Sequence, residues 1–234
     1  MDRKKIIIDI PFNVCTFSNK RLTKEWINQR ILIFMKFTLQ SLKIQTNQDF
    51  IALIQYDDST RELVKQALTN YDTLPHNVKF VSQSEHRYQI LECIRGYEYL
   101  YLVRLDSDDM YHKSFIQQLH EYKPKENTIA LINQNGYLYD SLQNRLAKIH
   151  FTSPPFYTLI YKVKDYIEGK RYKLPGGHTD VIKVPHEILD KANYVVVIHS
   201  NNDSTSFKLV KDKDIIIDEF KIKEILKEFM GNTN

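Results

Sequence analysis

Short apolar runs and helical periodicities alternate along the chain. Compact apolar runs predict buried strands at residues 6–10, 50–54, 78–81, 99–103, 128–132 and 194–198. Between them, apolar residues that recur every three or four positions predict helices at residues 24–43, 59–68, 87–95 and 114–122, and one more around residues 222–229. This alternation of strands and helices predicts an α/β fold.

The chain is expected to form one domain, residues 1–234, built from two halves. Residues 1–125 have the regular alternation typical of a nucleotide-binding half, whereas the regularity weakens after Pro154 and Pro155. Residues 126–234 are interpreted as an acceptor-binding half that ends in a C-terminal helix. Within it, Asn135 and Gly136 predict a hairpin turn. Two serine-led patterns, beginning at Ser59 and Ser114, predict capping boxes at helix starts.

The composition excludes several classes of protein. With 42% hydrophobic and 26% charged residues, the chain can bury a core and is not expected to be disordered. A net charge of +4 is too small to indicate a nucleic-acid partner. The 2 cysteines cannot form a disulfide framework, and no apolar run has the length of a membrane span, so a cytoplasmic location is expected. Lysines near the C-terminus leave open a contact with the inner face of the membrane, and the oligomeric state is not indicated.

An acidic cluster directly follows an uncharged predicted strand. The strand at 99–103 leads into Arg104, and then into Asp106, Asp108 and Asp109. Ligands of open α/β sheets bind beyond the carboxyl ends of the strands. Carboxylates this close repel one another, and such clusters usually persist because a cation neutralises them; Mg²⁺ and Mn²⁺ suit oxygen ligands. The alternative is a solvated acidic turn before the helix at 114.

Several segments resemble the GT-A family of nucleotide-sugar glycosyltransferases. Asp106, Ser107 and Asp108 resemble its DxD motif, and residues 94–116 resemble the stretch around that motif. Residues 41–46 are similar to the end of its first helix, and residues 50–59 to the strand whose end binds the nucleobase. In the second half, residues 154–158 and 197–202 resemble a rhamnosyltransferase family of the same fold. The resemblance implies a GT-A (Rossmann-like) fold with a mixed central sheet flanked by helices.

The resemblance also implies roles for individual residues and a reaction. Asp106 would contact the ribose or sugar of a nucleoside diphosphate-sugar, Asp108 would bind a divalent cation (Mn²⁺ or Mg²⁺), and His199 would complete its coordination. The remaining donor-binding residues are predicted to be Phe17, Arg30, Asp57, Arg87 and Arg104. Guanidinium groups suit phosphate oxygens, although Arg30, on the apolar side of its helix, and Arg104 could instead form structural ion pairs. The implied enzyme is an inverting hexosyltransferase that acts on a glycan or lipid-linked acceptor.

Inverting transfer needs a base, and the glycine-containing segment at 169–177 leads to the candidates. Asp180 is predicted to be that base, with His178 as its rival; a helix cap is the alternative role for Asp180. Two other functions stay open. A nucleotidyltransferase of the same fold would be expected to have a glycine-rich loop after its first strand, and residues 13–17 contain no glycine. A non-catalytic nucleotide-sugar-binding module would use the acidic cluster structurally.

Overall fold

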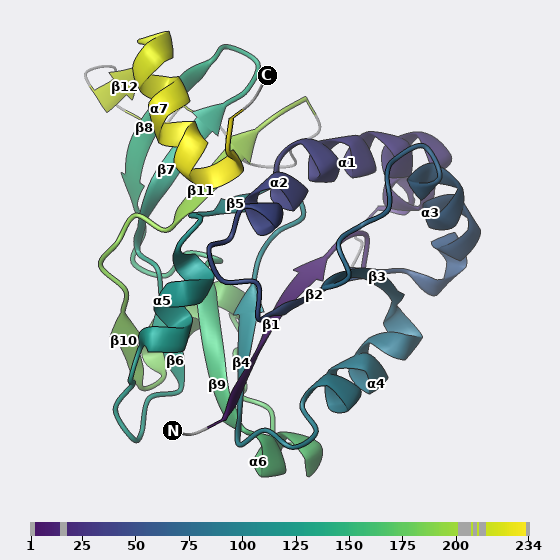
Figure 1. Ribbon diagram of the computed structural model, residues 1–234, viewed down its shortest axis with the longest axis vertical. Coiled ribbons are helices and arrows are strands. Elements are labelled where there is room, and N and C mark those ends of the chain that lie inside the picture. The colour runs from purple at the N-terminus through teal and green to yellow at the C-terminus, as the bar shows by residue number, and fades with distance from the viewer. Residues whose placement is uncertain (1–2, 15–17, 201–206, 208–209, 211–213, 233–234) are drawn as a thin grey trace.

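The computed structural model describes residues 3–14, 18–200, 207, 210 and 214–232. Within these residues the strands form two sheets (Figure 1). The larger, seven-stranded sheet has the spatial order β10 (His186–Ile188), β6 (Ala130–Ile132), β9 (Tyr157–Lys162), β4 (Tyr99–Arg104), β1 (Lys4–Pro11), β2 (Ile51–Tyr56) and β3 (Val78–Ser82). The smaller, five-stranded sheet has the order β12 (Ile215–Ile216), β8 (Arg145–His150), β7 (Asn135–Asp140), β11 (Tyr194–Ile198) and β5 (Met110–Tyr111).

The larger sheet is mixed. Strand β1 pairs in parallel with β2 and β4, and β2 with β3, whereas β9 runs antiparallel to both β4 and β6. The helices are α1 (Lys24–Lys36), α2 (Thr38–Lys43), α3 (Arg61–Leu68), α4 (Gln83–Cys93), α5 (Phe115–Glu121), α6 (Val163–Ile167) and α7 (Glu219–Met230), with short 3₁₀ segments at η1 (Asn19–Leu22), η2 (Asp58–Thr60) and η3 (Gly177–Lys183). The predicted α/β architecture with a mixed, helix-flanked sheet is confirmed.

The alternation of side chains along β1 explains how the helices are divided between the two faces of the larger sheet. Ile6, Ile8 and Ile10 point into a core shared with α1, α3 and α5, whereas Ile7 points into a core shared with α4 and α6. Because successive strand side chains point to opposite faces, an uninterrupted isoleucine run requires cover on both. Helix α7 packs instead against the smaller sheet, through Phe229 and its neighbours (Figure 1).

Helix boundaries differ from those predicted. The single helix expected at 24–43 is two helices, because the chain turns at Phe37, whose buried ring joins the core beneath α7. The two predicted capping boxes are wrong. Asp57, rather than Ser59, accepts the capping hydrogen bond, at 2.9 Å from the Ser59 backbone nitrogen. Ser114 precedes α5 but makes no side-chain cap.

The predicted hairpin turn at Gly136 is also wrong. Gly136 lies inside β7, between Ile149 of β8 and Tyr194 of β11, and the turn between β7 and β8 comes later, at residues 141–144. A Cβ atom at Gly136 would lie 2.5 Å from Cε2 of Tyr194. The Tyr194 ring cannot retreat easily, because it stacks on Phe156 with 3.8 Å between centroids. The glycine therefore makes room for an aromatic ring of the neighbouring strand.

Gly136→Ala is expected to lower the free energy of unfolding by about 1–3 kcal/mol, the usual cost of overpacking a core. Without the Tyr194 ring, the same change inside a strand would stabilise by roughly 0.5–1 kcal/mol, because glycine loses more backbone freedom on folding. Urea unfolding of Gly136→Ala, Tyr194→Leu and the double variant measures the coupling between the two positions. A Gly136→Ala protein as stable as the parent would contradict the steric role.

Candidate functional site

Parallel pairing gathers the carboxyl ends of β1, β2 and β4 at one edge of the larger sheet. The chain leaves that edge at Arg104 and crosses to the smaller sheet, where Met110 pairs antiparallel with Val195 of β11. The antiparallel register brings the residues before β5 next to those that follow β11. Asp108 and His199 therefore meet, although they are far apart in sequence.

Asp108 lies at the centre of this crossing and is buried, with 8% of its surface exposed. Its Oδ1 lies 2.9 Å from a terminal nitrogen of Arg30, and its Oδ2 lies 2.9 Å from Nε2 of His199. Burial alone would raise the pKa of this carboxyl, but the Arg30 charge and the His199 hydrogen bond outweigh it and lower the pKa of Asp108 below its usual value. The carboxylate is therefore held ionised in a largely water-free position.

Arg30 reaches the motif from α1 and uses each of its nitrogens. Its Nε donates to Oγ of Ser107 at 3.0 Å, and its NH1 lies 3.3 Å from Nε2 of His199, in addition to the ion pair with Asp108. The guanidinium also lies 5.8 Å from the centre of the Trp26 ring, one turn earlier on the helix. This explains why Arg30 lies on the apolar side of α1. Its long side chain extends from the core to the buried carboxylate of Asp108.

Arg104 pairs with Asp106, the first acidic residue of the motif. NH2 of Arg104 lies 3.1 Å from Oδ1 of Asp106, and both side chains are partly exposed. The hydroxyl of Tyr111 donates to the Arg104 carbonyl at 2.6 Å, which fixes the backbone where the strand ends. The structural ion pair that was the alternative role of Arg104 is thus formed with Asp106.

Asp109 is a buried residue with a structural partner. Its Oδ1 accepts a hydrogen bond from the Val197 backbone nitrogen at 3.0 Å, which ties the motif to β11. Burial, followed by the charges of Asp108 and Asp106, raises the pKa of Asp109 well above its usual value. Arg30 pairs with Asp108 and Arg104 with Asp106, so two of the three carboxylates have a guanidinium partner. The binding of a cation at this cluster stays a prediction.

A second acid–base pair, which sequence reasoning missed, lies at the end of β1. Oδ1 of Asp9 lies 2.9 Å from Nε2 of His86, which comes from α4. Asp9 is opposite Arg104 in the parallel register of β1 and β4, so the pair borders the motif. The signal was present in the sequence, since a carboxylate near the end of a buried strand is the pattern that identified Asp106.

The structure brings together some of the remaining predicted donor-binding residues and not others. Asp57 directly follows β2 at the same sheet edge, where its carboxylate caps η2 and its backbone nitrogen donates to Oδ1 of the buried Asn13 at 2.8 Å. Arg87 is exposed on α4, and among the described residues its side chain forms no hydrogen bond or ion pair with the motif. Phe17 lies outside the described residues. The donor-binding roles of these three residues stay predictions.

The segment η3 contains both candidates for the base. Asp180 accepts from the Gly176 backbone nitrogen at 2.7 Å and lies 2.6 Å from Nζ of Lys183. The bond to Lys183, and then that to Gly176, lower the pKa of Asp180. Burial lowers the pKa of His178, with a further decrease from Arg104 and an opposing effect from Asp106. The charges of Arg104 and Asp106 thus act on His178, whereas the Asp180 carboxylate is bound locally, to the Gly176 backbone and to Lys183.

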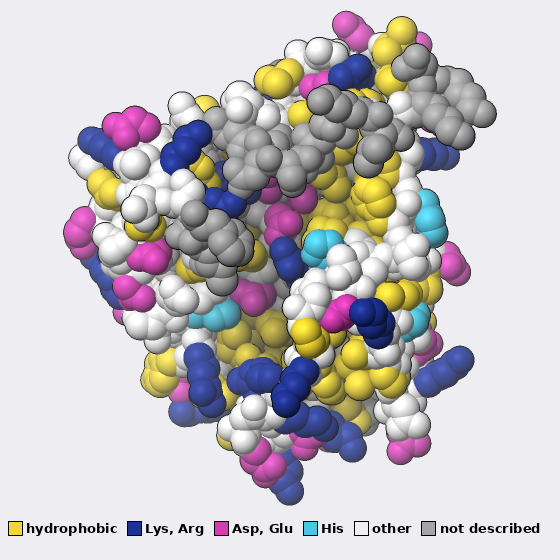
Figure 2. Space-filling model, turned by 180° about the vertical axis from the view of Figure 1, so that it is seen from behind, with side chains coloured by type: hydrophobic (Ala, Val, Ile, Leu, Met, Phe, Trp, Pro, Cys, Tyr) yellow, Lys and Arg dark blue, Asp and Glu magenta, His cyan; other side chains and the backbone are white. Residues whose placement is uncertain are grey.

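Asp108 and His199 are the candidates to hold a divalent cation, because carboxylate oxygens and imidazole nitrogens are both ligands for such ions. Oδ2 of Asp108 and Nε2 of His199 lie 2.9 Å apart, which is a hydrogen-bond length and also about the spacing of roughly 3 Å between neighbouring ligands of an octahedral ion. Among the described residues no group of three or more His, Cys, Asp or Glu side chains could hold a metal. The other coordination positions would be filled by phosphate oxygens and water, as is usual for Mg²⁺ in phosphate sites. Figure 2, which views the molecule from behind relative to Figure 1, shows acidic, basic and histidine side chains close together near the middle of the face that is drawn.

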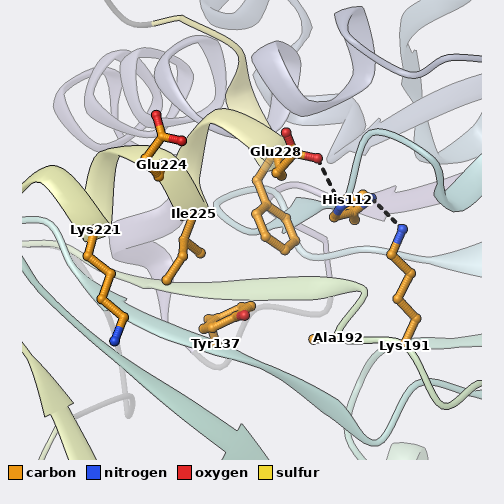
Figure 3. Close-up of a pocket in the computed structure, with 9 residues that line it drawn as sticks. His112, Tyr137, Lys191, Ala192, Lys221, Glu224, Ile225 and Glu228 are labelled. Carbon is orange, nitrogen blue, oxygen red and sulfur yellow. Dashed lines mark hydrogen bonds and ion pairs between the residues drawn. The ribbon is translucent and has the colours of Figure 1, made fainter.

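A cavity of about 360 Å³ lies elsewhere, between α7 and the smaller sheet (Figure 3). Tyr137 and Ile225 face each other across it, and Lys191 points toward His112 at one end. Its lining includes no residue of the motif and none of the predicted donor-binding residues. The candidate active site is therefore the buried cluster at the strand ends rather than this cavity.

Comparison with known proteins identifies the family. Residues 17–211, which are more than half of the chain, match the model of the family described as "Putative rhamnosyl transferase". The chain belongs to this family. The predicted membership is confirmed. No curated protein matched the sequence.

Solved structures show similarity at low identity. S. aureus TarS 1–349 in complex with UDP is 15% identical, with a TM-score of 0.46 over 83% of this chain and 60% of that one. The complex of the same protein with UDP-GlcNAc is 14% identical, with a TM-score of 0.45 over 95% of this chain and 65% of that one. A cytidylyltransferase from Leptospira borgpetersenii is 14% identical, with a TM-score of 0.38 over 82% of this chain and 78% of that one. This chain thus spans less than two thirds of the TarS chains.

In the part of the chain that the structure describes, none of the helices combines the length and the apolar character needed to cross a bilayer.

Proposed function

We propose that this protein transfers a sugar from a nucleoside diphosphate-sugar to a hydroxyl group, in a reaction that depends on a divalent cation. The observation that carries the proposal is the buried cluster of Arg30, Asp108 and His199 at the carboxyl edge of the sheet. Family membership supports rhamnose as the sugar. A glycan or a lipid-linked glycan is the acceptor that we propose.

Different site residues would contact different parts of the donor. Asp106, at the partly exposed end of β4, would contact the ribose or sugar. Arg104 and Arg30 would face the diphosphate, because guanidinium groups bind phosphate oxygens in a forked geometry. Asp108 and His199 would hold the cation, which supplies positive charge to the departing diphosphate. Because Asp108 and His199 are 8% and 6% exposed, charges here act with little screening by water.

The proposed transfer is inverting, with a base from η3 that accepts the proton of the acceptor hydroxyl. Asp180 was predicted for that role and stays a prediction, although its pairing with Lys183 opposes it. His178 has the better position, since it lies within electrostatic range of Arg104 and Asp106. Its lowered pKa keeps the imidazole neutral, and therefore able to accept a proton, at neutral pH.

The alternative of a nucleotidyltransferase has less support. Asn13 lies just after β1, and its buried amide donates to the Arg21 carbonyl at 3.2 Å and to Oγ1 of Thr60 at 3.1 Å. An asparagine used in this way ties the chain just after β1 to the segment that follows β2. A glycine-rich loop, by contrast, would present backbone nitrogens to a triphosphate.

A cytoplasmic location and peripheral contact with the inner membrane face stay predictions. Helix α7 has the sequence EFKIKEILKEFM, in which three glutamates are interspersed with three lysines. Its exposed Phe220 would be able to enter a lipid interface, but the mixed charge gives α7 no preference for an anionic surface.

A screen of UDP-, GDP- and dTDP-sugars tests the proposed function. One of these donors is expected to raise the melting temperature, and the increase should be larger with Mn²⁺ than with EDTA, because a ligand that binds only the folded state stabilises it by mass action. The same donor should be hydrolysed slowly without acceptor. If no donor shifts the melting temperature in either condition, the protein is not a glycosyltransferase of these donors.

A further inference from the structure

Arg30 occupies a position that concerns the cation as well as the donor. Its NH2 lies 2.9 Å from Oδ1 of Asp108, and its NH1 lies 3.3 Å from Nε2 of His199. Asp108 and His199 are the two side chains that we propose as ligands of the cation. The third nitrogen, Nε, is bound to Ser107 at 3.0 Å. The guanidinium thus lies against both candidate ligands at once, and 14% of its side chain is exposed.

Charge balance in this buried cluster depends on what is bound. In the protein alone, the positive charge of Arg30 matches the negative charge of Asp108 at 2.9 Å. A divalent cation added beside them would bring positive charge that nothing compensates, and it would be repelled by Arg30 at short range in a poorly screened site. A donor diphosphate adds negative charge, which can be shared between the guanidinium and the cation.

We propose that Arg30 makes cation binding conditional on the donor. In the donor-free protein Arg30 is the counter-ion of Asp108 and competes with a divalent cation for that carboxylate. When the diphosphate binds, it draws the guanidinium away, and Asp108 and His199 become available to the cation. The inference rests on the proposed function, because it assumes a diphosphate donor and a cation at Asp108.

The chemistry of the arginine side chain suits this exchange. A guanidinium forms forked hydrogen bonds with either a carboxylate or a phosphate, and is more weakly hydrated than an ammonium group. Cation and donor would then bind with positive cooperativity, and each would strengthen the other by the same factor, since coupling free energies are reciprocal. Binding would be ordered, with little cation taken up before the donor.

Mn²⁺ binding without nucleotide tests the competition directly. The free Mn²⁺ signal in electron paramagnetic resonance titrations gives the dissociation constant for the parent protein, Arg30→Gln and Arg104→Gln. Arg30→Gln is expected to bind Mn²⁺ more tightly than the parent by roughly tenfold, within the usual range of allosteric coupling. Arg104→Gln is the matched control. It removes the same charge from the same site, but the arginine that it replaces pairs with Asp106 rather than with Asp108. It should change the constant much less.

Further variants keep the outcome decisive. Adding Asp108→Asn to Arg30→Gln should abolish the gain, which places the ion at Asp108. If Arg30→Gln does not fold, Arg30→Met serves instead, since methionine keeps a long unbranched side chain but removes the charge that competes for Asp108; it should bind Mn²⁺ more tightly than the parent.

Two results would overturn the inference in different ways. If the variant binds Mn²⁺ no better than the parent, while the parent binds Mn²⁺ in the presence of UDP, GDP or dTDP, competition is wrong and the proposed function stands. If none of these proteins binds Mn²⁺ under any of these conditions, the inference and the cation dependence of the proposed function both fail.

Discussion

Asp108→Asn is expected to reduce sugar transfer by about 10²–10³-fold, the loss typical when one group that stabilises transition-state charge is removed. Asparagine keeps the size of the side chain but removes the charge that pairs with Arg30 and would hold the cation. The effect should appear in kcat as well as in donor affinity, since the cation acts on the departing diphosphate. Transfer assays at saturating Mn²⁺, with the donor identified by thermal shift, measure it.

The control must separate catalysis from folding. Asp49→Asn makes the same chemical change at a side chain that is 58% exposed and pairs with Lys5 at 3.2 Å. Surface changes of this kind usually alter stability by less than about 0.5 kcal/mol, so its transfer rate should match the parent. Urea unfolding of both variants shows whether Asp108→Asn is folded under assay conditions. Transfer within threefold of the parent, in folded Asp108→Asn, would remove Asp108 from the site.

The location of the site was predictable because it depends on strand order and strand ends. An uncharged run at 99–103 followed by Asp106 and Asp108 indicates a carboxyl-edge site before any coordinates are known. His199, which directly follows β11, was predicted from the resemblance of residues 197–202 to the rhamnosyltransferase family. Pairing of β5 with β11 then brings it to Asp108. Local pattern and resemblance were sufficient wherever the position of a residue follows from the sheet.

Charge compensation was not predictable, because it depends on side chains that are distant in sequence. The sequence shows three carboxylates in four positions, but not that Arg30 enters from α1 or that burial favours neutral Asp109. The prediction of a hairpin turn at Gly136 failed for a related reason. Asparagine followed by glycine predicts a turn locally, yet the glycine is needed because Tyr194 from β11 packs over it. In both cases a tertiary contact overrode the local signal.

His178→Gln is expected to lower transfer by roughly 10²–10⁴-fold, the range for a lost general base, whereas Asp180→Asn should have a much smaller effect. Both residues lie in η3, so each variant controls for disturbance of that segment. The bond of Asp180 to Lys183 at 2.6 Å stabilises its ionised form and makes it a weak base. Donor protection in thermal shift should be retained in both variants, because the base acts on the acceptor.

The pH profile tests which residue accepts the proton. A base must be unprotonated, so kcat/KM should fall as the pH decreases through the pKa of the base. For His178, burial lowers that pKa from its ordinary 6.5, so the fall should occur below pH 6.5. For Asp180, the bond to Lys183 lowers the pKa from 3.8, so no decrease from it would appear between pH 5 and 7.

The two observations together decide the assignment, because a structural role would not move the profile. If His178 only shapes the acceptor site, His178→Gln would raise KM and keep the decrease below pH 6.5. If it is the base, the variant loses both the rate and that decrease. Near-parent transfer in His178→Gln together with a large loss in Asp180→Asn would restore Asp180 as the base. Asp180 could act as the base only after the acceptor had displaced Lys183 from it. In that case Lys183→Gln, which removes the competing lysine, should transfer the sugar faster than the parent.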